Sequence, residues 1–233
     1  MDATLLFAIN DANASRRAVA TVTALGDGST RLVGPDDVTA DVLGREIESR
    51  FLTGKSGIVA GAGGEHFIRV HVPPPRLVIV GAVHISQVLA PMAKACSFDV
   101  AVIDPRSAFA TEERFAGIDL KADWPEEVLK DMPLDAYSAL AAVTHDPKID
   151  DFPLKAAIDA GCFYIGALGS RKTHETRCDR LREQGVTQAQ LDRIDAPIGL
   201  DIGAANPAEI AVAVLARVIE SLRKSPVALE AVA

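Results

Sequence analysis

The 233-residue sequence is poor in several features whose absence excludes whole classes of protein. It has three cysteines, Cys96, Cys162 and Cys178, and no CxxC pair. This pattern argues against a disulfide framework or a zinc cluster and fits a reducing, cytoplasmic compartment. No apolar run approaches the ~18 residues of a membrane helix, and residues 1–10 lack the basic start of a signal peptide. We therefore expect neither a membrane protein nor a secreted one.

Positive charge is also in deficit. The 24 lysines and arginines are outnumbered by 32 aspartates and glutamates, which leaves a formal net charge of −8. Nucleic-acid binding depends on cationic contacts with phosphates, so this balance argues against a nucleic-acid partner. A small anionic ligand held in a local basic pocket stays compatible with it.

The remaining composition is that of a globular protein, with 48% hydrophobic and 24% charged residues. The chain is long enough for one large domain or two unequal ones. Three consecutive prolines at 73–75 can neither continue a helix nor donate to a sheet, so they predict a stiff connector. We place a small domain at 1–72, the linker at 73–75 and a larger domain at 76–233.

The first segment shows a mixed pattern. Val38, Val42, Ile47 and Phe51 recur at helical spacing. Two β-type runs, separated by turn residues, precede this helical pattern. The prediction is a small α+β unit with strands at 17–25 and 31–33 around a turn at 26–30, a helix over 36–51, and two short strands within 57–72.

Beyond the linker, fully apolar strands alternate with helices, which is typical of a parallel sheet covered on both faces. In the helix predicted at 84–95, Ile85, Val88, Leu89 and Met92 follow the amphipathic pattern. Strands are predicted at 77–80, 100–103, 138–144 and 163–166, and further helices at 153–160, at 170–183 and from Pro207, with Asn206 as cap. The fold class is therefore α/β, a Rossmann-like doubly wound sheet preceded by a small α+β domain.

Ligands of such sheets bind beyond the carboxyl ends of the strands. The loop after the first strand contains Gly81, Ala82, Val83 and His84. A dinucleotide fingerprint would have glycine at position 83, so this loop is read either as a modified ligand loop or as a plain turn in which His84 caps the helix. Asp104 follows the second strand, at an offset from Gly81 that suits a ribose-binding carboxylate or, equally, a turn.

Three further loops contain polar or glycine residues at the same edge. In the first of them, Thr144-His145-Asp146-Pro147 is either a ligand loop or a turn started by Asp-Pro. Arg106, in the preceding loop two residues after Asp104, is a candidate phosphate contact. Ser170 is expected to cap a helix with Arg171 and Lys172 in its first turn, where cations oppose the helix dipole unless an anion binds there. In residues 197–204, Asp201 lies between two glycines. This segment is either a place where the backbone passes close to another group or a tight joint between a strand and a helix.

Taken together, these segments resemble the XdhC/CoxI family of accessory proteins for xanthine dehydrogenase and related molybdenum hydroxylases. The resemblance spans 76–224 and rests on 76–84, 102–106, 144–146, 166–172 and 196–204. It implies a protein that is not itself an enzyme and that holds the molybdenum cofactor, as molybdopterin or its dinucleotide form, during sulfuration and insertion. It also implies a molybdenum hydroxylase apo-enzyme and a cysteine desulfurase as partners, and a homodimer.

The resemblance implies a set of cofactor-binding residues, and it implies no catalytic residue and no metal ligand. The positions are Gly81, Ala82, His84, Asp104, Arg106, His145, Asp146, Gly169, Ser170, Arg171, Lys172, Asp201 and Gly203. Two departures from the family pattern are Val83, where a second glycine is usual, and the lack of any cysteine before Cys96. The alternative function is an NAD(P)-dependent oxidoreductase with His145 as its acid or base.

Overall fold

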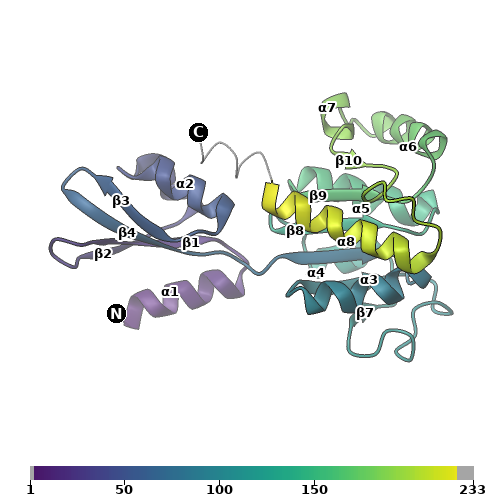
Figure 1. Cartoon of the computed structure of the whole chain (residues 1–233), viewed down its shortest axis with the longest axis horizontal. Helices are drawn as coiled ribbons and strands as arrows, with labels where there is room; N and C mark the ends of the chain where they lie inside the picture. The colour runs from purple at the N-terminus through teal and green to yellow at the C-terminus, as the bar shows by residue number, and fades with distance from the viewer. Residues whose placement is uncertain (1–2, 225–233) are drawn as a thin grey trace. The chain divides into compact units, whose positions relative to one another are not determined.

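The computed structural model describes residues 3–224, which form two compact units (Figure 1). The boundary along the chain falls between Pro73 and Pro74, and the second unit spans Pro74–Leu222. The predicted second domain extended to residue 233, and its last nine residues lie outside the described part of the chain.

The N-terminal unit is built on a four-stranded antiparallel sheet in the order β2-β1-β4-β3. Helix α2 packs against β1 and β4 of this sheet, and Ile47, Val22 and Ile68, one from each of these elements, are fully buried. Its elements are α1 (Ala3–Ala14), β1 (Val19–Ala24), β2 (Thr30–Val33), the 3-10 helix η1 (Pro35–Ala40), α2 (Gly44–Thr53), β3 (Gly57–Gly61) and β4 (Gly64–His71).

The single helix predicted over 36–51 is wrong. The chain breaks between η1 and α2, and Val42, predicted on the apolar face, is 75% exposed. The break is stabilised by Asp41, whose carboxylate accepts two 2.8 Å hydrogen bonds from Arg31 and one from the amide of Leu43. Helix α1 was not predicted at all. It buries only Ile9 and Ala12, too few positions to produce a clear periodic pattern.

The second unit contains a six-stranded, wholly parallel sheet in the order β10-β9-β8-β5-β6-β7. The chain runs outward from β5 to β7 and then returns to start β8 on the other side of β5, which is the doubly wound Rossmann order. Its strands are β5 (Arg76–Val80), β6 (Asp99–Ile103), β7 (Asp119–Lys121), β8 (Ser138–Ala142), β9 (Tyr164–Ala167) and β10 (Ile194–Asp195). The predicted α/β class is confirmed.

Helices cover both faces of this sheet (Figure 1). Leu77 and Ile79 of β5 face α3 and α8, whereas Val78 and Val80 face α4, α5 and α6. This alternation explains why the strand is apolar throughout. The helices are α3 (His84–Ala95), α4 (Pro125–Asp131), α5 (Pro147–Asp159), α6 (Arg171–Glu183), α7 (Gln188–Leu191) and α8 (Pro207–Lys224).

Several predicted boundaries needed correction. The strand predicted to reach residue 144 ends at Ala142, and the helix predicted from Pro153 begins at Pro147. Asp146 caps that helix by accepting a 3.0 Å hydrogen bond from the amide of Lys148, and Pro147 fits the first helical position because its missing N–H would have no partner there. Elements β7, α4, α7 and β10 were not predicted.

Candidate functional site

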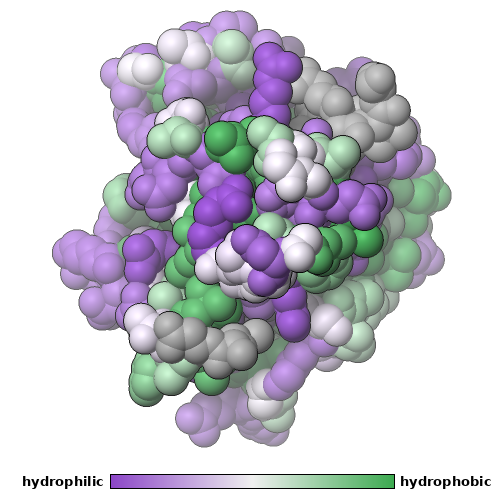
Figure 2. All heavy atoms as spheres, turned by 90° about the vertical axis from the view of Figure 1, so that its left-hand side faces the viewer, coloured by the Kyte–Doolittle hydropathy of each residue, from purple (hydrophilic) through white to green (hydrophobic). Residues whose placement is uncertain are grey.

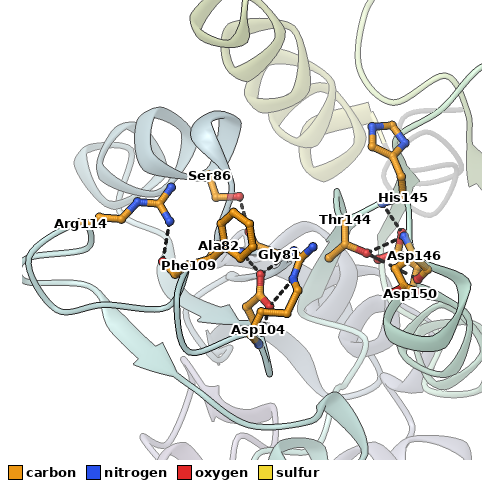
Figure 3. Close-up of polar contacts among 11 residues, drawn as sticks. Gly81, Ala82, Ser86, Asp104, Phe109, Arg114, Thr144, His145, Asp146 and Asp150 are labelled. Atoms are coloured by element: carbon orange, nitrogen blue, oxygen red, sulfur yellow. Dashed lines mark hydrogen bonds and ion pairs between the residues drawn. The ribbon is translucent and has the colours of Figure 1, made fainter.

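Gly81 directly follows β5, at the point where the strand order reverses. Its φ of +120° is disfavoured for other residues, and a Cβ built on it would lie 2.8 Å from Cγ2 of Thr144. The loop after β5 therefore lies directly against the loop after β8 (Figure 3). These two loops flank the switch point of the sheet, where Rossmann-type domains bind their ligands.

Asp104, at the end of β6, is fully buried beneath the β5 loop. Its carboxylate accepts a hydrogen bond from the amide of Ala82 at 2.7 Å (Figure 3). It also accepts two hydrogen bonds from the Arg106 guanidinium, at 2.8 and 2.9 Å. Burial by itself would raise the pKa of Asp104, but these hydrogen bonds outweigh it and hold the pKa below its ordinary value. Asp104 and Arg106 thus form an ion pair with each other, and the hydrogen bond from Ala82 to this pair fixes the β5 loop.

The first turn of α3 offers less than the sequence suggested. His84 is exposed and does not cap the helix, because the cap position is Val83, which has an extended backbone. The side chain of Val83 packs against the apolar core, while the Ser86 hydroxyl donates a hydrogen bond to the Gly81 carbonyl. The Gly81 carbonyl and the Ala82 amide are therefore already hydrogen-bonded within the chain, and residues 81–84 are called the closed β5 loop below.

The loop after β8 is organised around a buried carboxylate. Asp150 of α5, 1% exposed, accepts a 2.7 Å hydrogen bond from the Thr144 hydroxyl and a 3.1 Å hydrogen bond from the His145 amide. Burial raises the pKa of Asp150 to about 6 against these hydrogen bonds. His145 has a φ of +67°, and its ring is exposed to solvent (Figure 3). Asp150 therefore holds the backbone conformation that presents this ring.

The loop after β9 leads into α6 as predicted. Gly169 has a φ of +137°, and Ser170 caps the helix by accepting a 3.2 Å hydrogen bond from the amide of Thr173. Arg171 and Lys172 are both exposed in the first turn. Neither forms an ion pair among the described residues. Two cations therefore lie at the positive end of a helix dipole without compensation.

These two neighbouring cations line different pockets. Arg171 lines a pocket of about 480 Å³ together with Asp201 and Gly203 from the segment between β10 and α8. Lys172 lines a pocket of about 270 Å³ between α5 and α6, together with His145. The predicted residues are thus divided among the two pockets and the closed β5 loop.

The 197–204 segment includes a close backbone approach, and its partner is α8. A Cβ on Gly199, where φ is +89°, would lie 2.8 Å from the backbone of Ala213 and Val214. Gly203 has open space around it, and Asp201 is exposed. Gly199 therefore allows the segment to pack closely against α8, and Gly203 leaves room at the 480 Å³ pocket.

Arg177 was missed by the sequence analysis. It lines the smaller pocket, is only 2% exposed, and donates one 2.9 Å hydrogen bond to the Leu168 carbonyl. A signal was present, since position 177 lies four residues before the apolar Leu181 and so on the buried stripe of α6. Charged residues are rarely buried without a partner, which makes such a position informative.

Residues 3–224 contain no group of three or more His, Cys, Asp or Glu side chains arranged to hold a metal ion. Within the same residues, no helix is both long and apolar enough to cross a membrane.

Comparison with known proteins adds a family and several relatives. The family model described as the XdhC Rossmann domain matches residues 77–218. The chain is 33% identical over 182 residues to the uncharacterized protein YqeB of Escherichia coli K12, covering 73% of this chain and 31% of YqeB. It is 31% identical over 159 residues to a probable xanthine dehydrogenase subunit of Bacillus subtilis 168, covering 68% of this chain and 46% of that protein.

A third relative is the molybdenum cofactor insertion chaperone PaoD of Escherichia coli K12, 30% identical over 146 residues, with 63% of this chain and 40% of PaoD covered. The chain thus spans less than half the length of each of these three proteins. A crystal structure titled as a xanthine dehydrogenase from Bacillus halodurans superposes with a TM-score of 0.64 at 21% identity, covering 95% of this chain and 65% of that one. At this identity the likeness shows the fold alone.

Proposed function

Since the chain belongs to the XdhC family, we propose that it binds the molybdenum cofactor and assists its insertion into the apo-form of a molybdenum hydroxylase. The names of two relatives, a cofactor insertion chaperone and a xanthine dehydrogenase subunit, support this proposal. In this role the cofactor is cargo, and the chain binds and releases it without being an enzyme.

The observation that carries the proposal is the pair of exposed cations at the start of α6. The protein has a net charge of −8, yet Arg171 and Lys172 lie at a helix N-terminus, each beside a pocket. This arrangement is favourable when an anionic group binds there, because the helix amides and the cations then attract the same charge. The phosphate or pyrophosphate of a pterin cofactor is such a group.

Of the other expected positions, we propose direct ligand contact for His145, Asp201 and Gly203, which line these pockets. Gly169, Ser170 and Asp146 shape the loops around them. Gly81, Ala82, Asp104 and Arg106 act through the closed β5 loop, and exposed His84 lies at its edge. Because Asp104 is buried against Arg106, it has no free oxygen for a ribose, which weighs against the NAD(P)-dependent alternative.

The cysteines give this chain no evident sulfur-transfer group. Sulfur chemistry needs an accessible thiolate. Cys162 is buried and its pKa is raised to about 12, and burial also raises the pKa of Cys178. Cys96 is exposed but follows α3, at the sheet edge opposite the pockets. We propose that sulfur reaches the bound cofactor from a partner such as a cysteine desulfurase.

The N-terminal unit has features suited to a protein partner. Ile58 of β3 and Phe67 of β4 are opposite each other in the sheet and are 58% and 37% exposed, while Phe7 of α1 is 76% exposed. Figure 2 shows hydrophobic surface between hydrophilic side chains on the face of this unit. Adjacent exposed apolar side chains favour a protein contact, which we assign to the apo-enzyme.

The test is a binding measurement with purified protein and molybdenum cofactor. Replacing Arg171 and Lys172 together by alanine should weaken binding by about tenfold or more, because two charge-assisted contacts are lost. Lys130→Ala, which removes an exposed cation of α4, is the control and should leave affinity unchanged. Unchanged affinity in the double variant would remove the site assignment. Wild-type protein that binds NADH or NADPH, but no pterin, would replace the proposal by the oxidoreductase alternative.

A further inference from the structure

Arg177 is a buried charge that forms no ion pair with any residue in the described part of the chain. Its side chain is 2% exposed, and its single hydrogen bond, from Nη2, goes to the Leu168 carbonyl. Nε and Nη1 have no hydrogen-bond partner among the described residues. Burial lowers the pKa of this guanidinium, although Asp150 and Asp151 oppose the shift. Burying a cation in this state is costly unless something else completes its contacts.

The two nearby carboxylates are already engaged with other donors. Asp150 accepts from the Thr144 hydroxyl and the His145 amide. Asp151 accepts hydrogen bonds from Nε and Nη2 of Arg180, the latter at 2.9 Å. Their charges attract Arg177 across a distance, but neither carboxylate forms a hydrogen bond or close ion pair with it among residues 3–224. Nε and Nη1 of Arg177 therefore have no acceptor within the described residues.

The pocket beside Arg177 has the size and lining of a site for a small anion. Its volume is about 270 Å³, just below the ~300–1,000 Å³ typical of sites that enclose a drug-sized ligand. Lys172, which forms no ion pair among residues 3–224, and Arg180 add two cations to the lining, and Thr173 and Thr176 add hydroxyl groups. Asp150 and Asp151 also line the pocket, so its lining has three cations and two carboxylates, and both carboxylates already accept hydrogen bonds from other donors. Such a space admits one compact anionic group and excludes an entire pterin dinucleotide.

We propose that the pocket between α5 and α6 binds a phosphate group, with the guanidinium of Arg177 as its principal ligand and Lys172 at its rim. Arginine suits this role because its planar, forked donors match phosphate oxygens. The phosphate is either that of a larger ligand, whose remainder lies outside the pocket, or free inorganic phosphate. The first source rests on the proposed function, since the cofactor would then insert its phosphate here. The second source does not.

The experiment is a calorimetric titration of the full chain, at constant ionic strength, with inorganic phosphate, cytidine monophosphate and unphosphorylated cytidine. Wild-type protein should bind the two phosphates and not cytidine. Arg177→Gln should weaken phosphate binding by about 10- to 100-fold, the effect of losing hydrogen bonds to a charged group. Lys172→Gln, at an exposed position, should weaken it by about 2- to 5-fold.

Lys148→Gln is the matched control, because it removes an exposed cation of the neighbouring helix that does not line the pocket. If Arg177→Gln does not fold, the Lys172→Gln and Lys148→Gln pair decides the question. Tighter binding of the monophosphate than of inorganic phosphate assigns the site to a larger ligand, and the reverse order assigns it to the free anion. Absence of phosphate binding by the wild type, or equal affinities in wild type, Lys172→Gln and any folded Arg177→Gln, overturns the proposal.

A parallel titration with molybdenum cofactor separates this inference from the proposed function. Phosphate binding that depends on Arg177 or Lys172, in a protein without cofactor affinity, supports the pocket and contradicts the chaperone role. Cofactor binding without any phosphate response contradicts the pocket and supports the chaperone role.

Discussion

The hydroxyl of Thr144 donates a 2.7 Å hydrogen bond to Oδ1 of Asp150, which ties the loop after β8 to the first turns of α5. The second oxygen of the same carboxylate holds the His145 amide. This small network fixes a loop at the edge of the sheet, yet it buries an ionisable group whose pKa is raised to about 6. The loop is therefore ordered by a group that resists ionisation.

The first prediction concerns the pH dependence of the free energy of unfolding. The folded-state pKa of Asp150 is about 6, above the ordinary value of 3.8. Folding therefore favours the protonated form, and this carboxyl destabilises the protein as pH rises from about 4 to about 6. The two-unit shift corresponds to about 3 kcal/mol.

Asp150→Asn does not titrate, so its stability relative to the wild type should improve by about this amount between pH 4 and pH 7. The lost acceptor for the His145 amide adds a penalty that is independent of pH. Urea denaturation of both proteins at several pH values measures the difference. A difference that stays constant with pH would contradict the raised pKa.

The second prediction concerns the buried ion pair beneath the β5 loop. Asp104→Ala leaves the Arg106 guanidinium and the Ala82 amide without their acceptor. We expect a loss of about 3 kcal/mol, the lower end for breaking a buried pair, because Arg106 keeps a third of its side chain in solvent. Glu127→Ala, which breaks an exposed pair with Lys130, should cost less than about 1 kcal/mol. Equal losses in chemical denaturation would show that Asp104 does not organise the loop.

The third prediction separates a steric requirement for glycine from a conformational one. Gly199→Ala places a Cβ 2.8 Å from the α8 backbone at a positive φ, so we expect a loss of at least about 2 kcal/mol. Gly203→Ala also puts a side chain at a positive φ, of +71°, but with open space around it, and should cost about 1 kcal/mol. Thermal unfolding of the two variants compares them directly. Similar melting temperatures would mean that α8 moves aside without cost.

Local patterns predicted much of the second unit. The helix expected at 84–95 has these bounds in the structure, because its apolar stripe and its flanking strands both belong to one local unit. The error at 36–51 has a cause outside that segment, since Asp41 is held by Arg31 of β2. The late start predicted for α5 came from reading Pro153 as its first residue, whereas Asp146 and Pro147 form the N-terminus.

The candidate site was predictable in its location and less so in its roles. The sequence places polar residues after each strand, and the carboxyl ends of parallel strands meet at one edge. It does not show that Asp104 and Arg106 bind each other, because both residues fit a ligand contact equally well. It also does not show the importance of Arg177. This side chain is buried because α6 packs against α5, and it has no carboxylate partner there because Asp150 and Asp151 accept hydrogen bonds from other residues.

Because Arg171 and Lys172 are adjacent in sequence but line two different pockets, substitutions at these positions can report how far a bound ligand extends. A ligand that fills one pocket responds to one of the two substitutions, and the free-energy changes of the single and double variants then add. A ligand that reaches across the start of α6 couples the two positions, and a double-mutant cycle returns an interaction energy. The reach of an otherwise unseen ligand can thus be read from affinities alone.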